Sequence, residues 1–395
     1  MPGVLEDIRV LDMSRFISGP YCAQLLADMG AEVIRIEKIG GGDDRFLGPF
    51  TASNESMGAM IYNRNKKGIT LNIRSDQGRE LLKRLVKISD VVIENFTAGY
   101  LESLGIGYED LRKMNPGIIF ASISAYGGYG PYSRKGAFDQ IIQGMSGLMY
   151  VTGHPGDPPV KAGISLSDYG AALYTALGVV LALRHREKTG EGQMIDVSLF
   201  DTAISFLETI IPEYKVNHQV RPQIGNRRPY SAPTDTYRCR DGYVSISIST
   251  EALWRRFTKL IGREDLTNDP RFTGNANRTV NQHYLNNLAA AWAADTTVEE
   301  ALRVLDEAHI PCGTVQTITE VVEDPQVKAR EMVVDVDHPG SGSVPLPGIV
   351  IKMSKTQGKI DTPAPQVGQH NEEIFGQLLG LSVEEIDELK EKNVM

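Results

Sequence analysis

The first forty residues carry the pattern that most constrains the fold, which is an apolar strand, a helix and a second apolar strand in close succession. We predict a strand over Ile8–Asp12, a helix from Tyr21 to about Met29 that ends at Gly30, and a strand over Val33–Glu37. Ser18-Gly19-Pro20 is expected to break the chain before the helix. A strand, a helix and a strand within about thirty residues predict a right-handed crossover in a parallel sheet.

The alternation continues, and its character changes after about Arg221. A helix over Asp76–Ile88 and three further strands are predicted, at Asp90–Glu94, Ile118–Ser124 and Gln193–Leu199. Beyond Arg221 the pattern indicates a smaller α+β unit, with a hairpin at Thr236–Arg240 and Tyr243–Ser249, helices over 252–262, 282–293 and 297–308, and a strand near 313–316. Gly340–Gly348 has the composition of a linker, and Ser382-x-x-Glu385 predicts a capping box before a last helix. With 395 residues the chain is long enough for two domains.

Charge and cysteine content exclude several classes of protein. A formal net charge of -9 argues against wrapping nucleic acid or docking on an anionic membrane. Cys22, Cys239 and Cys312 lie far apart, and the seven histidines show no metal-ligand spacing. The first residues (MPGVLEDIRVLDMS) do not have the pattern of a secretion signal. We therefore expect a cytoplasmic protein without a structural metal.

The stretch Lys161–Arg184 places one carboxylate, Asp168, before an apolar run from Ala171 to Leu183. A run of thirteen residues is too short to span a bilayer, so it predicts a buried helix with Asp168 at its N-terminal end. Free backbone N–H groups and the helix dipole should keep Asp168 ionised near neutral pH. Two interpretations remain open on the residues alone: Asp168, or Ser167 beside it, is an N-cap, or Asp168 is a nucleophile held by a rigid element.

Two loops after predicted strands suggest an anion site. Lys38–Arg45 is rich in glycine, and Asn63–Gly68 is a compact basic loop before the short strand ITLNI. Their basic residues could meet a polyphosphate together, although for any one of them a solvated surface turn is the simpler interpretation: Lys38, Arg45, Arg64, Lys66 and Lys67. The turn after the first strand lacks GxGxxG, which argues against a nicotinamide dehydrogenase.

Motifs in order along nearly the whole chain resemble the class III CoA-transferases, also called the CaiB/BaiF family, with formyl-CoA and carnitine CoA-transferases as members. They are Leu11-Asp12, Gly19-Pro20, Ala31–Glu37, Asn65–Gly68, Glu94-Asn95-Phe96, Gly128–Pro131, Gly190–Gln193 and Gly225-Asn226-Arg227. The resemblance implies an α/β fold with a Rossmann-like large domain over 1–205 and 349–395, a smaller α+β domain over 225–325, and linkers at 206–224 and 326–348. It also implies a homodimer of interlocked ring-shaped subunits.

The same resemblance implies the chemistry. Asp168 would be the nucleophile that moves CoA from an acyl-CoA to a small carboxylic acid through a mixed anhydride and an aspartyl-CoA thioester. CoA would be a substrate, with no permanently bound cofactor and no metal. By match to the family, Lys38 would reach the CoA phosphates, Phe16, Leu71 and Phe96 would line the adenine and pantetheine path, and Asn95 would bond CoA. From the loop pattern above, Arg45, Lys66 and Lys67 are added as candidate CoA ligands. The N–H groups of Gly127–Gly130, including Gly128 and Gly130, or of Gly163 are candidate oxyanion donors.

Departures from the family pattern bear on specificity. Ile17 stands where formyl-CoA transferase has a glutamine, Phe138 where it has a tyrosine, and Ser103 where an arginine often reaches CoA; a GGGGQ-like loop is missing from the 240s to 260s. We therefore expect a pocket, lined by Ile17 and Phe138, that is more apolar than one built for oxalate. Arg227 and Arg228 could hold a second substrate carboxylate, but a solvated loop pair is the simpler interpretation.

Two alternative functions differ in class. An α-methylacyl-CoA racemase would need a Gly-His-Asp where this chain has Ala137-Phe138-Asp139, and phenylalanine cannot exchange a proton. His154, in a Gly/Pro loop, is a poor substitute for that base. A non-catalytic CoA-binding subunit of a heteromeric transferase is the second alternative, and the presence of Asp168 argues against it.

Overall fold

The computed structural model describes residues 3–395, and these divide into two compact units. The large unit contains the chain up to Leu148, Ala162–Glu208 and Pro325–Met395. The small unit contains Met149–Lys161 and Thr209–Asp324. The chain thus leaves the large unit twice and returns to it twice. Its C-terminal segment belongs to the same unit as the N-terminal sheet and does not form a domain of its own.

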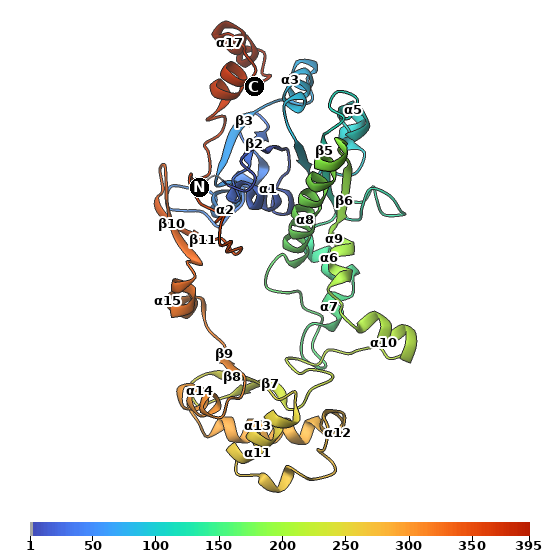
Figure 1. Cartoon of the computed structure of the whole chain (residues 1–395), viewed down its shortest axis with the longest axis vertical. Coiled ribbons are helices and arrows are strands. Elements are labelled where there is room, and N and C mark those ends of the chain that lie inside the picture. Colours follow the sequence, from blue (N-terminus) through green and yellow to red (C-terminus); the bar gives the residue numbers. More distant parts are fainter. Residues whose placement is uncertain (1–2) are drawn as a thin grey trace. The chain divides into compact units, whose positions relative to one another are not determined.

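A six-stranded parallel sheet forms the centre of the large unit, in the order β3-β2-β1-β4-β5-β6 (Figure 1). The strands are β1 (Arg9–Asp12), β2 (Glu32–Glu37), β3 (Lys66–Thr70), β4 (Val91–Glu94), β5 (Ile119–Ser124) and β6 (Met194–Ser198). This order is that of dinucleotide-binding α/β folds, in which ligands bind where the order reverses, here between β1 and β4. The predicted α/β class with a parallel sheet is confirmed.

Alternate residues of the central strands β1, β2, β4 and β5 serve two separate cores, one on each face of the sheet. On one face, Leu11 of β1 packs with helices α3 (Asp76–Lys87), α4 (Tyr100–Ser103), α5 (Tyr108–Leu111) and α17 (Val383–Glu391) and the π-helix η3 (Glu372–Leu378). On the other face, Val10 packs with α1 (Ser18–Asp28), α6 (Asp139–Met145), α8 (Leu166–Thr189) and α9 (Leu199–Ser205). Strands covered on both faces read as continuous apolar runs, which is why they were recognisable in the sequence.

Helix α1 begins earlier than predicted. Ser18, Gly19 and Pro20 form its first turn instead of a break, since proline is tolerated where no intrahelical N–H bond is needed. A Cβ added at Gly19 would lie 2.1 Å from the Cβ of Ser14, so glycine allows the loop after β1 to approach the helix closely. The predicted crossover from β1 through α1 to β2 is otherwise present.

Helix α8 is longer than its apolar run indicated, with 24 residues, and by length and composition alone it could cross a membrane. It lies beside α1 against β5 and β6, and its inner residues Ala171, Thr175 and Val179 are fully buried (Figure 1). Its opposite side exposes a stripe of apolar side chains: Leu173, Tyr174, Leu177, Val180 and Leu181. The helix is therefore a core element with one uncovered apolar side.

Residues 326–348, which were expected to form a linker, instead contain α16 (Pro325–Ala329) and an antiparallel hairpin of β10 (Val333–His338) and β11 (Gly342–Pro347). Val336 and Leu346 of the hairpin pack on Met60 of α2 (Met57–Asn63). The glycine and proline content suggested a linker, but glycines at positive φ make the turn and the apolar residues on either side make the strands. The predicted capping box of Ser382 and Glu385 is present at the start of α17.

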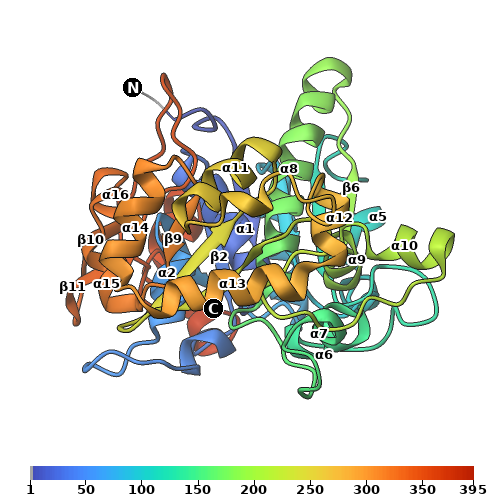
Figure 2. The ribbon, with the colours of Figure 1, turned by 90° about the horizontal axis from the view of Figure 1, so that it is seen from below.

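The small unit is built on a three-stranded antiparallel sheet, β7 (Thr234–Arg238), β8 (Tyr243–Ser247) and β9 (Cys312–Thr314), which confirms the predicted hairpin. Helices α11 (Glu251–Leu260), α13 (Gln282–Ala294) and α14 (Val298–Glu307) pack around it through a core that contains Trp254 and Phe257 (Figure 2). The remaining elements of the chain are η1 (Asp43–Phe46), α7 (Leu148–Val151), α10 (Ile210–Asn217), η2 (Glu264–Leu266), α12 (Asn275–Val280) and α15 (Ile318–Glu323).

Candidate active site

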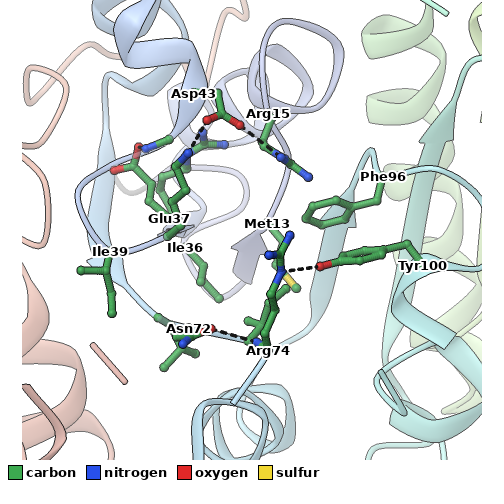
Figure 3. Close-up of a pocket in the computed structure, with 15 residues that line it drawn as sticks. Met13, Arg15, Ile36, Glu37, Ile39, Asp43, Asn72, Arg74, Phe96 and Tyr100 are labelled. Carbon is green, nitrogen blue, oxygen red and sulfur yellow. Dashed lines mark hydrogen bonds and ion pairs between the residues drawn. The ribbon is translucent and has the colours of Figure 1, made fainter. Parts of the chain in front are cut away.

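A pocket of about 410 Å³ opens at the carboxyl ends of β1 to β4, at the point where the strand order reverses (Figure 3). Each strand contributes the residues that directly follow it. The lining residues are Met13, Arg15, Arg35, Ile36, Glu37, Lys38, Ile39, Gly42, Asp43, Leu71, Asn72, Ile73, Arg74, Phe96 and Tyr100. The pocket therefore has both apolar and cationic walls, which suits a ligand that carries an aromatic group and phosphates.

Three cations border the open part of this pocket. Arg15 donates to Asp43 at 3.2 Å, and Lys38 also pairs with Asp43 (Figure 3). Arg74 donates to the hydroxyl of Tyr100 at 3.3 Å. The hydrogen bond and the charge of Lys38, and those of Arg15, lower the pKa of Asp43. The ionised Asp43 carboxylate therefore pairs with both cations, as the phosphate of a ligand would.

Asp168 lies in the first turn of α8 and contacts the first turn of α1. Its carboxylate lies near the side chain of Ser18, which is the first residue of α1. The Asn95 side chain, just beyond β4, donates to the Ser18 hydroxyl at 3.4 Å and to the carbonyl of Arg15 at 2.6 Å. The side chain of Asn95 thus connects the first turn of α1, beside Asp168, to the loop that forms one wall of the pocket.

The protonation of Asp168 differs from the sequence expectation. Burial first, and then the negative charge of Asp139, raise the pKa of Asp168 to about 7 from its usual 3.8, while the Ser18 hydroxyl opposes them. The prediction of full ionisation from the helix end was wrong because Asp139 is the group that takes the helix-end amide, accepting the N–H of Ser167 at 2.9 Å. A half-buried carboxylate with a pKa near 7 is partly neutral and partly nucleophilic at physiological pH.

Capping does not account for Asp168. The N-cap of α8 is Ser165, and the carboxylate that bonds the first turn is Asp139 of α6, which also accepts from the Ser167 hydroxyl at 2.6 Å and from Gln143 at 2.7 Å. Asp139 is therefore the residue whose side chain holds the start of α8. Neither Ser167 nor Asp168 acts as an N-cap, so the Asp168 carboxylate is left for other contacts.

Three tyrosines border the same turn. The hydroxyls of Tyr62 and Tyr169 are 2.9 Å apart, and the ring of Tyr21 lies on that of Tyr169 with centroids 4.7 Å apart. Burial is the first cause that raises the pKa of Tyr62, and the negative charge of Asp168 contributes. These three rings, from α1, α2 and α8, pack together beside the first turn of α8.

The structure brings several of the predicted CoA residues together. Lys38, Leu71 and Phe96 all line the pocket. Phe16 and Phe138 contact each other edge to face, with centroids 5.7 Å apart, and Phe138 is 67% exposed. Ile17 directly precedes Ser18 and is the N-cap of α1.

Other predicted phosphate ligands are engaged inside the protein. Lys66 lies in β3, not in a loop, and its buried ammonium bonds Asp12 at 2.7 Å and the carbonyl of Pro20 at 2.9 Å. Arg45 pairs with Glu37 at 2.8 Å, and Lys67 pairs with Glu32 at 2.8 Å and with Glu373. Arg64 is buried against Asp28 at 2.7 Å. These four cations neutralise nearby acids of the large unit, which corrects the expectation that they face a polyphosphate.

The glycine loop after β5 offers fewer free donors than expected. The N–H of Gly127 is donated to Ser124 and that of Gly128 to Asp196, each at 2.9 Å. Gly130 has φ 93°, and a Cβ there would meet open space. The amides of Gly127 and Gly128 are therefore occupied in this structure.

Sequence reasoning missed four residues of the site: Arg15, Arg74, Ser18 and Asp139 as a partner of α8. Arg15 and Arg74 each lie a few residues after a predicted strand, so the rule that ligands bind at the carboxyl ends of parallel strands would have selected them. The contacts of Ser18 and Asp139 join segments far apart in the chain, and local sequence gives no signal for them.

Comparisons with known proteins identify the relatives of this chain. Residues 5–371 match the family described as CoA-transferase family III. Succinyl-CoA--D-citramalate CoA-transferase of Chloroflexus aurantiacus is 38% identical over 396 residues, covering 100% of this chain and 98% of the relative. The alpha subunit of Succinyl-CoA--L-malate CoA-transferase, also of Chloroflexus aurantiacus, is 33% identical over 395 residues, covering 99% of this chain and 92% of the relative.

The fold agrees as well. The crystal structure of a CAIB/BAIF family protein from Brucella suis matches with a TM-score of 0.85 and 34% identity, covering 96% of this chain and 100% of that one. The sequence, the fold and the relatives together show that this chain belongs to CoA-transferase family III, whose members transfer coenzyme A between an acyl-CoA and a carboxylic acid.

Proposed function

We propose that Asp168 carries the acyl group and then CoA during transfer. The observation that supports this most is its half-buried carboxylate, whose raised pKa is near 7 and which no cation pairs in the described part of the chain. An unpaired and poorly solvated carboxylate is a stronger nucleophile than one in water, because less solvation has to be removed before it attacks.

The reaction would proceed in two symmetric halves. Asp168 attacks the thioester carbonyl carbon, the C–S bond breaks, and CoA thiolate leaves behind a mixed anhydride. The thiolate then attacks the aspartyl carbonyl carbon, which forms an aspartyl-CoA thioester and releases the donor acid. An acceptor carboxylate attacks this thioester, and the returning thiolate attacks the acceptor's carbonyl carbon, which gives the new acyl-CoA and frees Asp168. Each step exchanges one activated acyl group for another, so exclusion of water preserves the thioester energy.

The pocket between β1 and β4 would hold the nucleotide end of CoA. Lys38, Arg15 and Arg74 supply positive charge for phosphates, and Phe96 offers an aromatic surface beside Leu71. Arg15 already lies over the Phe96 ring, 4.5 Å from its centroid. Asn95 and Ser18 lie between this pocket and Asp168, so the pantetheine arm would pass along the start of α1.

We propose succinyl-CoA as the donor and a small hydroxydicarboxylic acid as the acceptor. The names of two relatives that cover nearly the whole chain, with D-citramalate and L-malate as acceptors, support this choice. Specificity cannot follow from the fold alone, since one fold serves many substrates.

We also propose that the protein is cytoplasmic and works as a dimer. The apolar stripe on α8, with Leu173, Leu177 and Leu181 each more than half exposed, supports an interface with a second copy. A heteromer with a related chain is the alternative, because one relative is named as an alpha subunit. The interlocked arrangement implied by the family resemblance is part of the same proposal.

The proposed chemistry predicts a covalent intermediate that can be trapped. The protein is incubated with succinyl-CoA, acetyl-CoA and other acyl-CoAs, treated with borohydride or hydroxylamine, and analysed by peptide mass spectrometry. A modified Asp168 peptide, absent from Asp168→Asn, is expected. CoA binding without any adduct, together with exchange of the proton α to the thioester, would instead favour a racemase. CoA binding with neither result would favour a non-catalytic subunit.

A further inference from the structure

We propose that Glu94 is a positioning residue of the CoA pocket, because its buried carboxylate holds the turn after β4 in the shape that presents Phe96 to CoA. This inference rests on the proposed place of CoA between β1 and β4, and it does not depend on the role of Asp168. Its consequence is that CoA binds more tightly when Glu94 is ionised.

The first step concerns the contact that Glu94 makes. Glu94 is the last residue of β4, and only 6% of its surface is exposed. Its side chain turns back on the chain that follows, where Oε2 accepts the N–H of Phe96 at 2.8 Å. A chain that leaves a strand has backbone groups that the sheet no longer pairs, and here the carboxylate supplies the partner. The bond therefore fixes the direction in which Phe96 leaves the sheet.

The second step concerns Phe96, which forms the aromatic wall of the pocket. The guanidinium carbon of Arg15 lies 4.5 Å from the centroid of the Phe96 ring, and the centroids of Phe96 and Tyr100 are 5.1 Å apart (Figure 3). Arg15 and Tyr100 line the same pocket. A displacement of Phe96 would therefore disturb two further walls of the pocket.

Asn95, the middle residue of the turn, joins it to the loop after β1. Its Oδ1 accepts the N–H of Arg15 at 2.7 Å, and its Nδ2 donates to the carbonyl of Arg15 at 2.6 Å. These two bonds connect the loops on either side of the point where the strand order reverses. Of the three residues of the turn, Glu94, Asn95 and Phe96, only Glu94 is ionisable, so its charge is the property of the turn that pH can change.

The third step concerns the charges around Glu94. The paired strands place Ser122 of β5 opposite Glu94, and Asp196 of β6 opposite Ser122. Burial first, and then the negative charges of Glu102 on α4 and of Asp196, raise the pKa of Glu94 to about 7, while Ser122 and the N–H of Phe96 oppose them. Glu94 therefore changes its charge in the physiological range of pH.

The ionised and protonated forms of Glu94 hold the turn unequally. An ionised carboxylate accepts an N–H more strongly than a neutral carboxyl group does. Because the raised pKa is near 7, Glu94 is mostly ionised at pH 8 and mostly protonated at pH 6. The contribution of Glu94 to CoA affinity should therefore fall by about fivefold from pH 8 to pH 6, the difference between a charged and a neutral hydrogen bond.

Charge alone would act in the opposite direction. CoA is a polyanion, so neutralising an acid near its pocket should strengthen binding. At about 0.15 M salt, exposed charges separated by more than roughly 8 Å are largely screened, whereas a hydrogen bond inside the protein is not. The direction of the change in affinity thus separates a positioning role from an effect of charge.

The test compares CoA binding by Glu94→Gln, Glu94→Ala and Glu102→Gln with that of their parent, by calorimetric titration at pH 6 and pH 8. Every protein carries Asp168→Asn, which removes the other carboxylate whose pKa is near 7. Titration of the CoA phosphates affects all of these proteins equally.

Glu94→Gln preserves the shape of the side chain and a neutral acceptor. Its CoA affinity should be about fivefold lower than that of the parent at pH 8 and similar to it at pH 6. Glu94→Ala removes the acceptor and should bind CoA more weakly at both pH values. Glu102→Gln is the same change at an exposed position, so it should bind CoA like the parent at pH 8.

A stability measurement separates positioning from a general structural role. A carboxyl group whose pKa rises on folding binds more protons in the folded state, so ionised Glu94 lowers the stability of the protein at pH 8. Glu94→Gln removes this effect, and its Tm at pH 8 should equal or exceed that of the parent while its CoA affinity is lower. A Tm that falls together with the affinity would overturn the positioning role.

CoA binding by folded Glu94→Gln that is as tight as in the parent at pH 8, or tighter, would overturn the inference. The same pH dependence in Glu94→Gln and in the parent would also overturn it, as would an equal loss in Glu102→Gln. Lys38→Ala separates this inference from the proposed site. If Lys38→Ala binds CoA as the parent does, the placement of CoA fails, and this inference fails with it. If Lys38→Ala weakens binding and Glu94→Gln does not, only this inference fails.

Discussion

Asp168 shows how neighbouring residues decide what one side chain can do. The apolar run after it was visible in the sequence, but its protonation depends on burial and on Asp139, which lies 29 positions earlier in the chain. A second carboxylate near the first keeps part of the population protonated around pH 7. The nucleophilic form is the ionised one, so activity should follow the ionised fraction.

This gives a prediction for the pH dependence. Because the raised pKa of Asp168 is near 7, kcat/KM should rise as pH increases through about 7 and level off above it. Asp139→Asn removes the repelling charge, so the rising limb should move to lower pH, and activity at pH 6 relative to the plateau should increase roughly threefold or more. A limb that stays in place in folded Asp139→Asn would show that Asp139 does not act on Asp168 through its charge. Gln143→Leu, which removes a different partner of Asp139, serves as the packing control.

The charged residues of the pocket give a second prediction: removal of a cation and removal of its carboxylate partner should change CoA affinity in opposite directions. Lys38→Ala should weaken CoA binding about five- to thirtyfold, since a phosphate contact with a charged donor contributes roughly 1–2 kcal/mol. Asp43→Ala removes the carboxylate that occupies Lys38 and Arg15, so it should strengthen binding. Calorimetric titration with CoA measures both. Weaker binding in both variants would mean that Asp43 supports the pocket instead of competing with the ligand.

At the scale of the elements, the sheet and most helices could be predicted because strands buried on both faces and amphipathic helices leave clear local patterns. The starts of α1 and β3 could not. Ser18-Gly19-Pro20 has the composition of a turn, yet it is held in a helix by contacts with the loop after β1. Lys66 belongs to β3 because Asp12, 54 positions away, receives its charge inside the sheet. The starts of these two elements therefore depend on contacts between residues far apart in the chain, which local composition does not reveal.

The buried pair of Lys66 and Asp12 leads to a stability prediction for β3. Lys66→Met removes the nearer of the two cations that pair with buried Asp12 and leaves Arg35, at 3.5 Å, as the other. The cost should be roughly 3 kcal/mol in the free energy of unfolding, the lower end of the range for breaking a buried pair. Lys67→Met, which breaks partly exposed pairs on the next residue of the same strand, should cost about 1 kcal/mol or less. Chemical denaturation compares the two. Equally small losses in both variants would show that other groups stabilise the Asp12 carboxylate without Lys66. A strong loss of CoA affinity in folded Lys67→Met would show that Lys67 contacts the ligand.

At the scale of the whole molecule, α8 exposes an apolar side that the single chain does not cover. Leu173, Leu177 and Leu181 recur at helical spacing and are 53%, 55% and 60% exposed. A soluble chain seldom leaves such a stripe uncovered. The sequence showed that the run was apolar, but only the structure showed which side of it faces the core.

A dimer that covers this stripe predicts a clear effect of charge. Leu177→Glu should shift the protein to monomers, as measured by sedimentation or light scattering, because a carboxylate would be buried without a partner. Glu187→Gln, an exposed change on the last turn of the same helix, should leave the assembly state as in the wild type. A Leu177→Glu protein with wild-type mass in solution would place the interface elsewhere.

The most direct test of the account follows oxygen atoms. If Asp168 forms a mixed anhydride with the acceptor and the thiolate then attacks the acceptor's carbonyl carbon, one carboxylate oxygen of the acceptor must remain on Asp168. A single turnover with succinyl-CoA and an acceptor labelled with oxygen-18 should therefore leave one labelled oxygen in the peptide that contains Asp168. Formation of the new acyl-CoA with no label in that peptide would contradict the assignment of Asp168 as the nucleophile.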